Sequence, residues 1–264
     1  MPDIFEEITK IRREGAAVAL ATVVSGERGS PGKSGFRMLV YSTGTISGTV
    51  GGGLLEEKVR EEALRCIAEK KSKLLDFTLD EKSADSIGAI CGGMVKIFIE
   101  PIPSASTLYV FGGGHIALPL VQFAKALDLS VVVVDDRQEF ANKDRFPLAD
   151  EVKLGEFSQV IKTIEFHEND CVVIITHGHE HDEEVLEACL TKVKLPSYIG
   201  MIGSKEKIAI TYSHLKNKGI AEQLLGKVNA PIGLNIGSQT PAEIALSIAA
   251  EIVANRHEKL DSMN

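Results

Sequence analysis

Apolar and polar positions along the chain follow two different patterns, which divide it near residue 100. In the first region, apolar residues recur at helical spacing over 3–14 and 54–70, and short apolar runs around these segments predict strands. The predicted strands are 17–24, 36–42, 45–50, 73–79 and 94–100. Because most of them are joined by short, glycine-containing loops, we expect a small α+β domain built mainly on antiparallel hairpins.

The second region alternates strand and helix. Strands are predicted at 107–111, 130–135, 171–176 and 197–202, and helices at 115–127, 158–165, 182–192, 205–216 and 241–256. This alternation predicts an α/β fold with a Rossmann-like, doubly wound parallel sheet. The intervening sequence EPIPSAS contains two prolines and is typical of a linker. We therefore expect domains at 1–100 and 107–264, with a linker at about 101–106.

Composition narrows the classes of function. The chain has 264 residues and a formal charge of −8; residues 1–100 hold 14 basic and 15 acidic side chains, and residues 101–264 hold 15 and 22. An acidic protein lacks the basic surface that nucleic acids require, so we expect no nucleic-acid partner. The apolar runs are far shorter than the roughly 20 residues of a membrane span, and the first residues lack an apolar signal core. These features predict a cytoplasmic protein without a membrane partner.

A glycine-rich motif follows the first strand of the second region. Residues 112–117 read Gly-Gly-Gly-His-Ile-Ala, which is a G-x-G-x-x-A pattern between a predicted strand and a predicted helix. Such a turn lets the backbone approach a phosphate, and acidic residues after the next strand accept a ribose hydroxyl. A scaffold whose turn merely requires small residues would show the same pattern. The candidate nucleotide contacts are Gly112, Gly114, His115, Asp135 and Asp136.

A second glycine-rich stretch lies in the first region. Residues 28–55 contain no Asp or Glu, and residues 26–53 contain nine glycines. Backbone amides, a helix N-terminus and basic side chains together favour an anion, although glycines of hairpin turns and solvated basic residues would give the same pattern. The candidate anion-binding residues are Arg28, Lys33, Arg37, Gly51, Gly52 and Gly53.

Cysteine and histidine side chains give two further candidates. Cys91 lies between Ile90 and two glycines, where a thiolate is accessible to a ligand or a soft metal; a buried, inert thiol is the alternative. The segment 175–184, ITHGHEHDEE, resembles the zinc motif of metallo-β-lactamases, but its Asp-His pair is reversed. A zinc hydrolase therefore remains a third hypothesis, and its alternative is that His177 or Asp182 lines the crevice at the carboxyl ends of the strands. The residues concerned are His177, His179, His181 and Asp182.

Several segments together resemble the XdhC/CoxI family. They are residues 21–59, 86–101, 109–120, 131–147 and 231–252, with further matches at ITHGHEHD and YIGMIGSKEK, so the resemblance covers nearly the whole chain. Members of this family are accessory proteins of xanthine dehydrogenase and related molybdenum hydroxylases, which bind the molybdenum cofactor, protect it during sulfuration and help to insert it. The resemblance thus implies a maturation factor or chaperone rather than an enzyme.

The resemblance also implies ligands and partners. The molybdenum cofactor (molybdopterin) is the implied ligand, and a nucleotide such as NAD(P) is a candidate for the Rossmann half. Xanthine dehydrogenase or a related molybdenum hydroxylase is the implied client; a cysteine desulfurase and a second copy of the chain are further candidate partners. The alternative function, an NAD(P)-dependent oxidoreductase, rests on the Gly112–Ala117 turn with Asp135 and not on the resemblance. The resemblance assigns the anionic part of the cofactor to Arg28, Ser30, Lys33, Arg37 and Gly51–Gly53, and the molybdenum or its sulfur ligands to Cys91.

Overall fold

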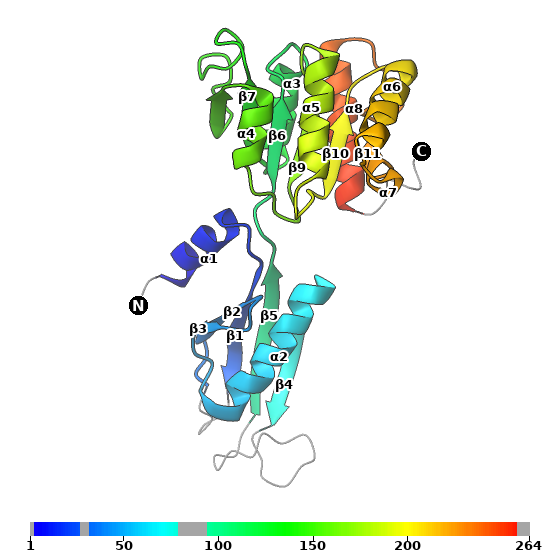
Figure 1. The fold of residues 1–264 in the computed structure, drawn as a ribbon. Coiled ribbons are helices and arrows are strands. Elements are labelled where there is room, and N and C mark those ends of the chain that lie inside the picture. The colour runs from blue at the N-terminus through cyan, green and yellow to red at the C-terminus, as the bar shows by residue number, and fades with distance from the viewer. Residues whose placement is uncertain (1–2, 27–31, 79–93, 258–264) are drawn as a thin grey trace. The chain divides into compact units, whose positions relative to one another are not determined.

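The computed structural model describes residues 3–26, 32–78 and 94–257, which form two compact units (Figure 1). Unit 1 comprises Met1–Ala105 and unit 2 comprises Ser106–Asn264. The last strand of unit 1 continues through Pro101 to Ile102, so the prolines of the expected linker belong partly to the sheet. None of the helices in the described part of the chain has the length and apolar character needed to cross a membrane.

Unit 1 contains one antiparallel sheet of five strands in the order β3-β2-β1-β5-β4. Alternating burial along the strands places one set of side chains on each face, as in β4, where intermediate and exposed positions alternate. The strands are β1 (Val18–Gly26), β2 (Arg37–Tyr41), β3 (Ile46–Gly48), β4 (Lys73–Thr78) and β5 (Met94–Ile102).

The two helices of unit 1 pack on opposite faces of this sheet. Helix α2 (Gly53–Glu69) covers the face that contains Met38 and Val40 of β2. Helix α1 (Ile4–Arg13), capped by Asp3, packs against the face that contains Leu39. Because alternate residues of a strand point to opposite faces, each position of β2 belongs to one helix or the other.

Unit 2 contains a six-stranded, fully parallel sheet in the order β11-β10-β9-β6-β7-β8. Numbered from its first strand, this is the order 3-2-1-4-5-6 of dinucleotide-binding Rossmann folds. The predicted fold class is therefore confirmed. The strands are β6 (Thr107–Phe111), β7 (Ser130–Asp135), β8 (Glu151–Leu154), β9 (Cys171–Ile174), β10 (Tyr198–Met201) and β11 (Val228–Asn229).

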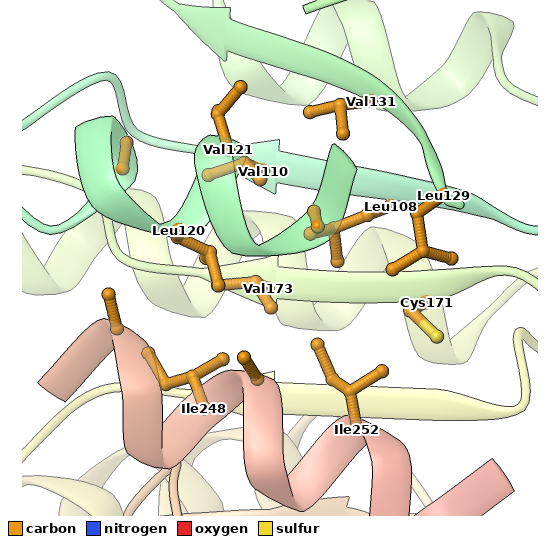
Figure 2. Close-up of a cluster of buried hydrophobic side chains, with 14 of the residues drawn as sticks. Leu108, Val110, Leu120, Val121, Leu129, Val131, Cys171, Val173, Ile248 and Ile252 are labelled. Atoms are coloured by element: carbon orange, nitrogen blue, oxygen red, sulfur yellow. The ribbon is translucent and has the colours of Figure 1, made fainter. Parts of the chain in front are cut away.

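Helices cover both faces of the parallel sheet, so every central strand is buried on both sides. Helices α3 (Ala117–Ala126) and α8 (Pro241–Arg256) lie on one face. Figure 2 shows Leu120 of α3 and Ile248 of α8 over Val110 and Val173 of the strands. The opposite face carries α4 (Phe157–Thr163), α5 (His179–Leu190), α6 (Lys205–Asn217) and α7 (Glu222–Leu225).

Three elements of unit 2 were not expected from the sequence: β8, α7 and β11. Each has four residues or fewer, which is too short to show a periodic pattern. Helix α3 begins at Ala117 rather than at residue 115, and α5 begins at His179 rather than at residue 182.

Candidate functional site

The candidate site lies at the carboxyl ends of the strands of unit 2, where the direction of chain winding reverses. Strand β6 pairs with β7 on one side and with β9 on the other. Helix α3, which follows β6, packs on one face of the sheet, and helix α5, which follows β9, packs on the other. Open α/β sheets bind ligands at such a switch point. The turn Gly112–Gly114 follows β6 directly and therefore lies at this switch point.

The three glycines of this turn differ in what surrounds them. A methyl group on Gly112, whose φ is +112°, would overlap the carbonyl oxygen of Ile175 beyond β9. A methyl group on Gly113 would overlap the carbonyl oxygen of Phe140. A methyl group on Gly114 would meet no atom of the residues that the structure describes within 4 Å. The first two glycines are therefore required by close packing, whereas Gly114 leaves the backbone open to an approaching ligand.

Asp135 has a different role from the ribose acceptor that the sequence suggested. Its side chain is fully buried, and Oδ2 accepts hydrogen bonds from the Gly113 amide at 2.7 Å and from Arg137 Nη2 at 3.0 Å. Oδ1 accepts from the Arg137 amide and Nε at 3.0 and 2.9 Å. Burial raises the pKa of Asp135, but the bonds from Arg137 and Gly113 outweigh it, so the pKa is lowered overall. Asp135 thus holds the turn, and Asp136 is the carboxylate nearer to solvent.

Arg145 is a site residue that the sequence analysis missed. Its Nε donates a hydrogen bond of 3.0 Å to the carbonyl oxygen of Gly113, and its guanidinium lies 5.0 Å from the ring centre of Phe140. The side chain is half-buried, so the positive charge is held against the turn. No sequence pattern indicates this arginine, because it follows the turn by more than thirty residues and reaches it only through the fold.

The start of α3 adds backbone donors to the same turn. Among the described residues, no side chain caps the N-terminus of α3 at Ile116, so the amides of Ala117 and Leu118 have no side-chain acceptor there; the third residue, Pro119, has no N–H. Such amides, together with the helix dipole, favour a bound anion. His115 is exposed immediately before the helix.

The histidine motif lies close to the same turn, and the structure brings only part of it together. His177 Nε2 lies 2.9 Å from Asp136 Oδ1, and the rings of His177 and His181 lie 4.8 Å apart between centres. His179 is exposed at the start of α5 and is not part of this group. Asp182 is buried and accepts hydrogen bonds from the Thr176 amide and hydroxyl; burial raises its pKa despite these bonds.

In unit 1 the structure separates the residues of the expected anion site. Arg37 shares its face of β2 with Leu39, and its guanidinium lies 5.2 Å from the ring centre of Phe5 in α1. The glycines 51–53 precede α2, which packs on the other face. The Arg37 side chain and the helix that follows the three glycines therefore lie on opposite faces of the sheet.

The amides before α2 are also occupied within the protein. Gly51 N donates to Thr49 Oγ1 at 3.1 Å, and Gly52 N donates to Glu56 Oε1 at 3.0 Å. The Glu56 carboxylate also accepts a hydrogen bond from the Thr49 hydroxyl. It therefore lies where an external anion would bind.

Of the other predicted residues of unit 1, the structure describes Lys33. This lysine is exposed in the turn before β2, and its neighbour Gly32 packs closely against the carbonyl oxygen of Val50. Arg28, Ser30 and Cys91 lie outside the described residues.

The fold and the site define a class of protein: a small antiparallel domain joined to a Rossmann domain with an open glycine turn at its switch point. The chain matches the model of the XdhC Rossmann domain over residues 108–252 and that of the XdhC and CoxI family over residues 11–78. The chain therefore belongs to the XdhC/CoxI family.

Individual relatives agree with this assignment. An uncharacterized Escherichia coli protein, YqeB, is 32% identical over 95% of this chain and 46% of its own length. A Bacillus subtilis protein, named as a probable subunit of xanthine dehydrogenase, is 31% identical over 61% of this chain and 46% of its own length. The chain thus spans about half the length of these relatives. A crystal structure described as a xanthine dehydrogenase from Bacillus halodurans has the same fold, with a TM-score of 0.53, 22% identity and coverage of 98% of this chain and 97% of that one.

Proposed function

We propose that the protein is an accessory factor that binds the molybdenum cofactor and delivers it to xanthine dehydrogenase or a related molybdenum hydroxylase. Membership of the XdhC/CoxI family supports an accessory role to such enzymes. The relative from Bacillus subtilis carries the name of a xanthine dehydrogenase subunit.

The observation that carries the proposal is the arrangement around Gly114. The molybdenum cofactor ends in a phosphate, which some forms extend to a nucleotide. The open backbone at Gly114, the Arg145 guanidinium on the adjacent carbonyl and the uncapped first turn of α3 together fit such a group. In this proposal, the turn of the Rossmann domain holds the phosphate end.

The cysteine thiols are the candidate contacts of the molybdenum end of the cofactor. Cys66, Cys171 and Cys189 are buried free thiols. Burial raises the pKa of Cys66, raises that of Cys171 to about 11 and raises that of Cys189 to about 12, so these thiols resist the deprotonation that metal binding needs. Cys91 is the remaining cysteine of the sequence, and we propose that it approaches the molybdenum or its sulfur ligands.

Gel filtration of the chain after mixing with molybdenum cofactor tests the proposal. The wild-type chain should elute with bound molybdenum, whereas the variants Gly114→Ala and Arg145→Gln should lose most of the bound molybdenum. Arg256→Gln, a change of an exposed arginine on α8, is the matched control and should behave as wild type. Cys91→Ala tests the metal end separately. Absence of molybdenum from the wild-type fraction would rule the proposal out.

An NAD(P)-dependent oxidoreductase is the second candidate, because the strand order and the glycine turn are those of dinucleotide-binding folds. Asp135 is committed to Arg137 and Gly113, so Asp136 would have to accept the ribose hydroxyl. Titration with NADH and NADPH by fluorescence distinguishes the candidates. Saturable binding of NADH or NADPH that Asp136→Asn weakens would favour the oxidoreductase, and absence of binding of both at millimolar concentration would exclude it.

A further inference from the structure

Three metal-ligating side chains converge beside the glycine turn of unit 2. Asp136 follows β7, His177 follows β9, and His181 lies in the first turn of α5. One ligand atom from each lies within 4.8 Å of those of the other two, and His177 Nε2 is 2.9 Å from Asp136 Oδ1. No second group of this kind occurs within 3–26, 32–78 and 94–257.

We propose that Asp136, His177 and His181 bind one divalent transition-metal ion of the Zn²⁺ type. Two imidazoles and one carboxylate form a donor set that suits zinc and its neighbours rather than magnesium or calcium. Ligand atoms that each lie about 2.0 to 2.1 Å from a tetrahedral ion are roughly 3.3 Å apart. The spacing of the three groups brackets this value, so small rotations of the side chains complete the site.

The charges around the group leave a negative excess at Asp136. Arg137 makes two side-chain hydrogen bonds to Asp135 and thereby neutralises that carboxylate. Its Nε lies farther from Asp136 Oδ1, at 3.8 Å. Asp136 therefore carries a charge that a cation between the two imidazoles would balance.

A carboxylate outside the group lies near His181. Glu184 Oε2 lies 3.7 Å from His181 Nδ1, which is beyond hydrogen-bond distance. Metal-bound histidines commonly donate the N–H of their second ring nitrogen to a carboxylate. A rotation of the Glu184 side chain would bring its carboxylate to that position.

Packing holds both rings in place. The buried ring of Phe157, at the start of α4, lies 5.4 Å from the His181 ring and 6.1 Å from the His177 ring between centres. Asp182 binds the amide and hydroxyl of Thr176, which orders the connection between β9 and α5. The two histidines are therefore positioned from different elements before any ion binds.

Three protein ligands leave at least one coordination position for water or another oxygen ligand. The group lies at the same strand edge as the Gly112–Gly114 turn, so an anionic oxygen of a ligand on that turn can occupy this position. Metal binding by this group involves residues of unit 2 alone and does not require delivery of a molybdenum cofactor.

Direct metal binding tests the inference. The full chain without an affinity tag, stripped of metal, is titrated with Zn²⁺ in competition with a chromophoric chelator and with Co²⁺ by visible absorption. Wild type should bind about one ion per chain, with the intense Co²⁺ bands of a four- or five-coordinate site. Asp136→Asn, His177→Ala and His181→Ala should each weaken binding by at least about 10-fold.

His179→Ala is the matched control, because His179 is exposed in the same motif but outside the group. It should bind as wild type does, and circular dichroism should show that every variant is folded. Absence of Zn²⁺ and Co²⁺ binding by wild type would reduce the group to a hydrogen bond between His177 and Asp136 and would overturn the inference. Equal affinity in all four variants would overturn it as well. Neither readout depends on retention of the molybdenum cofactor.

Discussion

Two glycine-rich turns precede helices in this protein, and they differ in where their backbone amides are directed. Before α2, the amides of Gly51 and Gly52 bind Thr49 and Glu56 of the same segment. Before α3, Asp135 takes the Gly113 amide from within the fold, and its carboxylate is itself paired with Arg137. The space beside Gly114 is open, as it also is beside Gly52 and Gly53. A glycine-rich turn is therefore available to a ligand only where the protein's own acceptors leave part of it open.

The charged side chains around the two glycine-rich turns also differ. Glu56 brings a carboxylate to the turn before α2, and Arg37 lies on the other face of the sheet. At the turn before α3, Arg145 brings a guanidinium to the carbonyl of Gly113. Residues 28–55 contain no Asp or Glu, but the next residue, Glu56, places its carboxylate at the turn before α2. The second half of the chain is acidic overall, yet the charged side chain at its glycine turn is the positive Arg145.

The largest expected effect concerns the packing of the turn before α3. Gly112→Ala should lower the free energy of unfolding by about 3 kcal/mol, because the methyl group would overlap the Ile175 carbonyl and the residue has a positive φ. Gly114→Ala should change it by less than about 1 kcal/mol. Urea denaturation of both variants measures the contrast. Similar losses in both would mean that Gly114 is also a packing glycine.

A slightly smaller effect is expected for the carboxylate that holds this turn. Asp135→Asn should cost about 2 to 3 kcal/mol near neutral pH, because it leaves a partly buried Arg137 without its partner charge. The pKa of Asp135 is lowered in the folded state, so its contribution is complete above the ordinary pKa of 3.8 and is lost as pH falls through the lower folded value.

Urea denaturation of wild type and Asp135→Asn from about pH 7 to pH 3 measures this dependence. The difference in stability between the two should be greatest at neutral pH and should shrink in the acid range. A difference that does not change with pH would show that Asp135 acts through shape and hydrogen bonding without its charge.

The smallest effect is expected at the turn before α2. Glu56→Ala should cost about 1 kcal/mol, because the Gly52 amide and the Thr49 hydroxyl lose their acceptor. Glu57→Ala, an exposed neighbour in the same helical turn, is the control and should be close to neutral. Thermal unfolding of both variants measures the difference in stability. Equal losses of stability would show that Glu56 does not cap the helix.

The sequence predicted the two architectures well because each rests on a repeated local pattern. The alternation of strands and helices in unit 2 and the paired strands of unit 1 appear as periodic runs of apolar residues. Elements such as β8 and α7 have four residues each, and tertiary contacts rather than periodicity define them.

The site was predicted less completely, because its members come from separate elements. The motif around Gly114 is local and was visible in the sequence. Arg145 reaches the turn, and Asp136 reaches His177, only through the fold. The placement of Arg37 opposite α2 follows from the alternation of Met38 and Val40 along β2, which glycine content and charge alone do not reveal.

Affinity for the molybdenum cofactor in a matched pair of glycine variants tests the central claim most directly. Gly114 and Gly53 both have open space where a methyl group would be added, and each belongs to one of the two turns. Because Gly53 has a positive φ of 62°, circular dichroism first confirms that its variant is folded. The account predicts that Gly114→Ala loses binding at least about 10-fold, since the methyl group fills the phosphate position, and that Gly53→Ala binds as wild type. Loss of binding in Gly53→Ala with full binding in Gly114→Ala would contradict it.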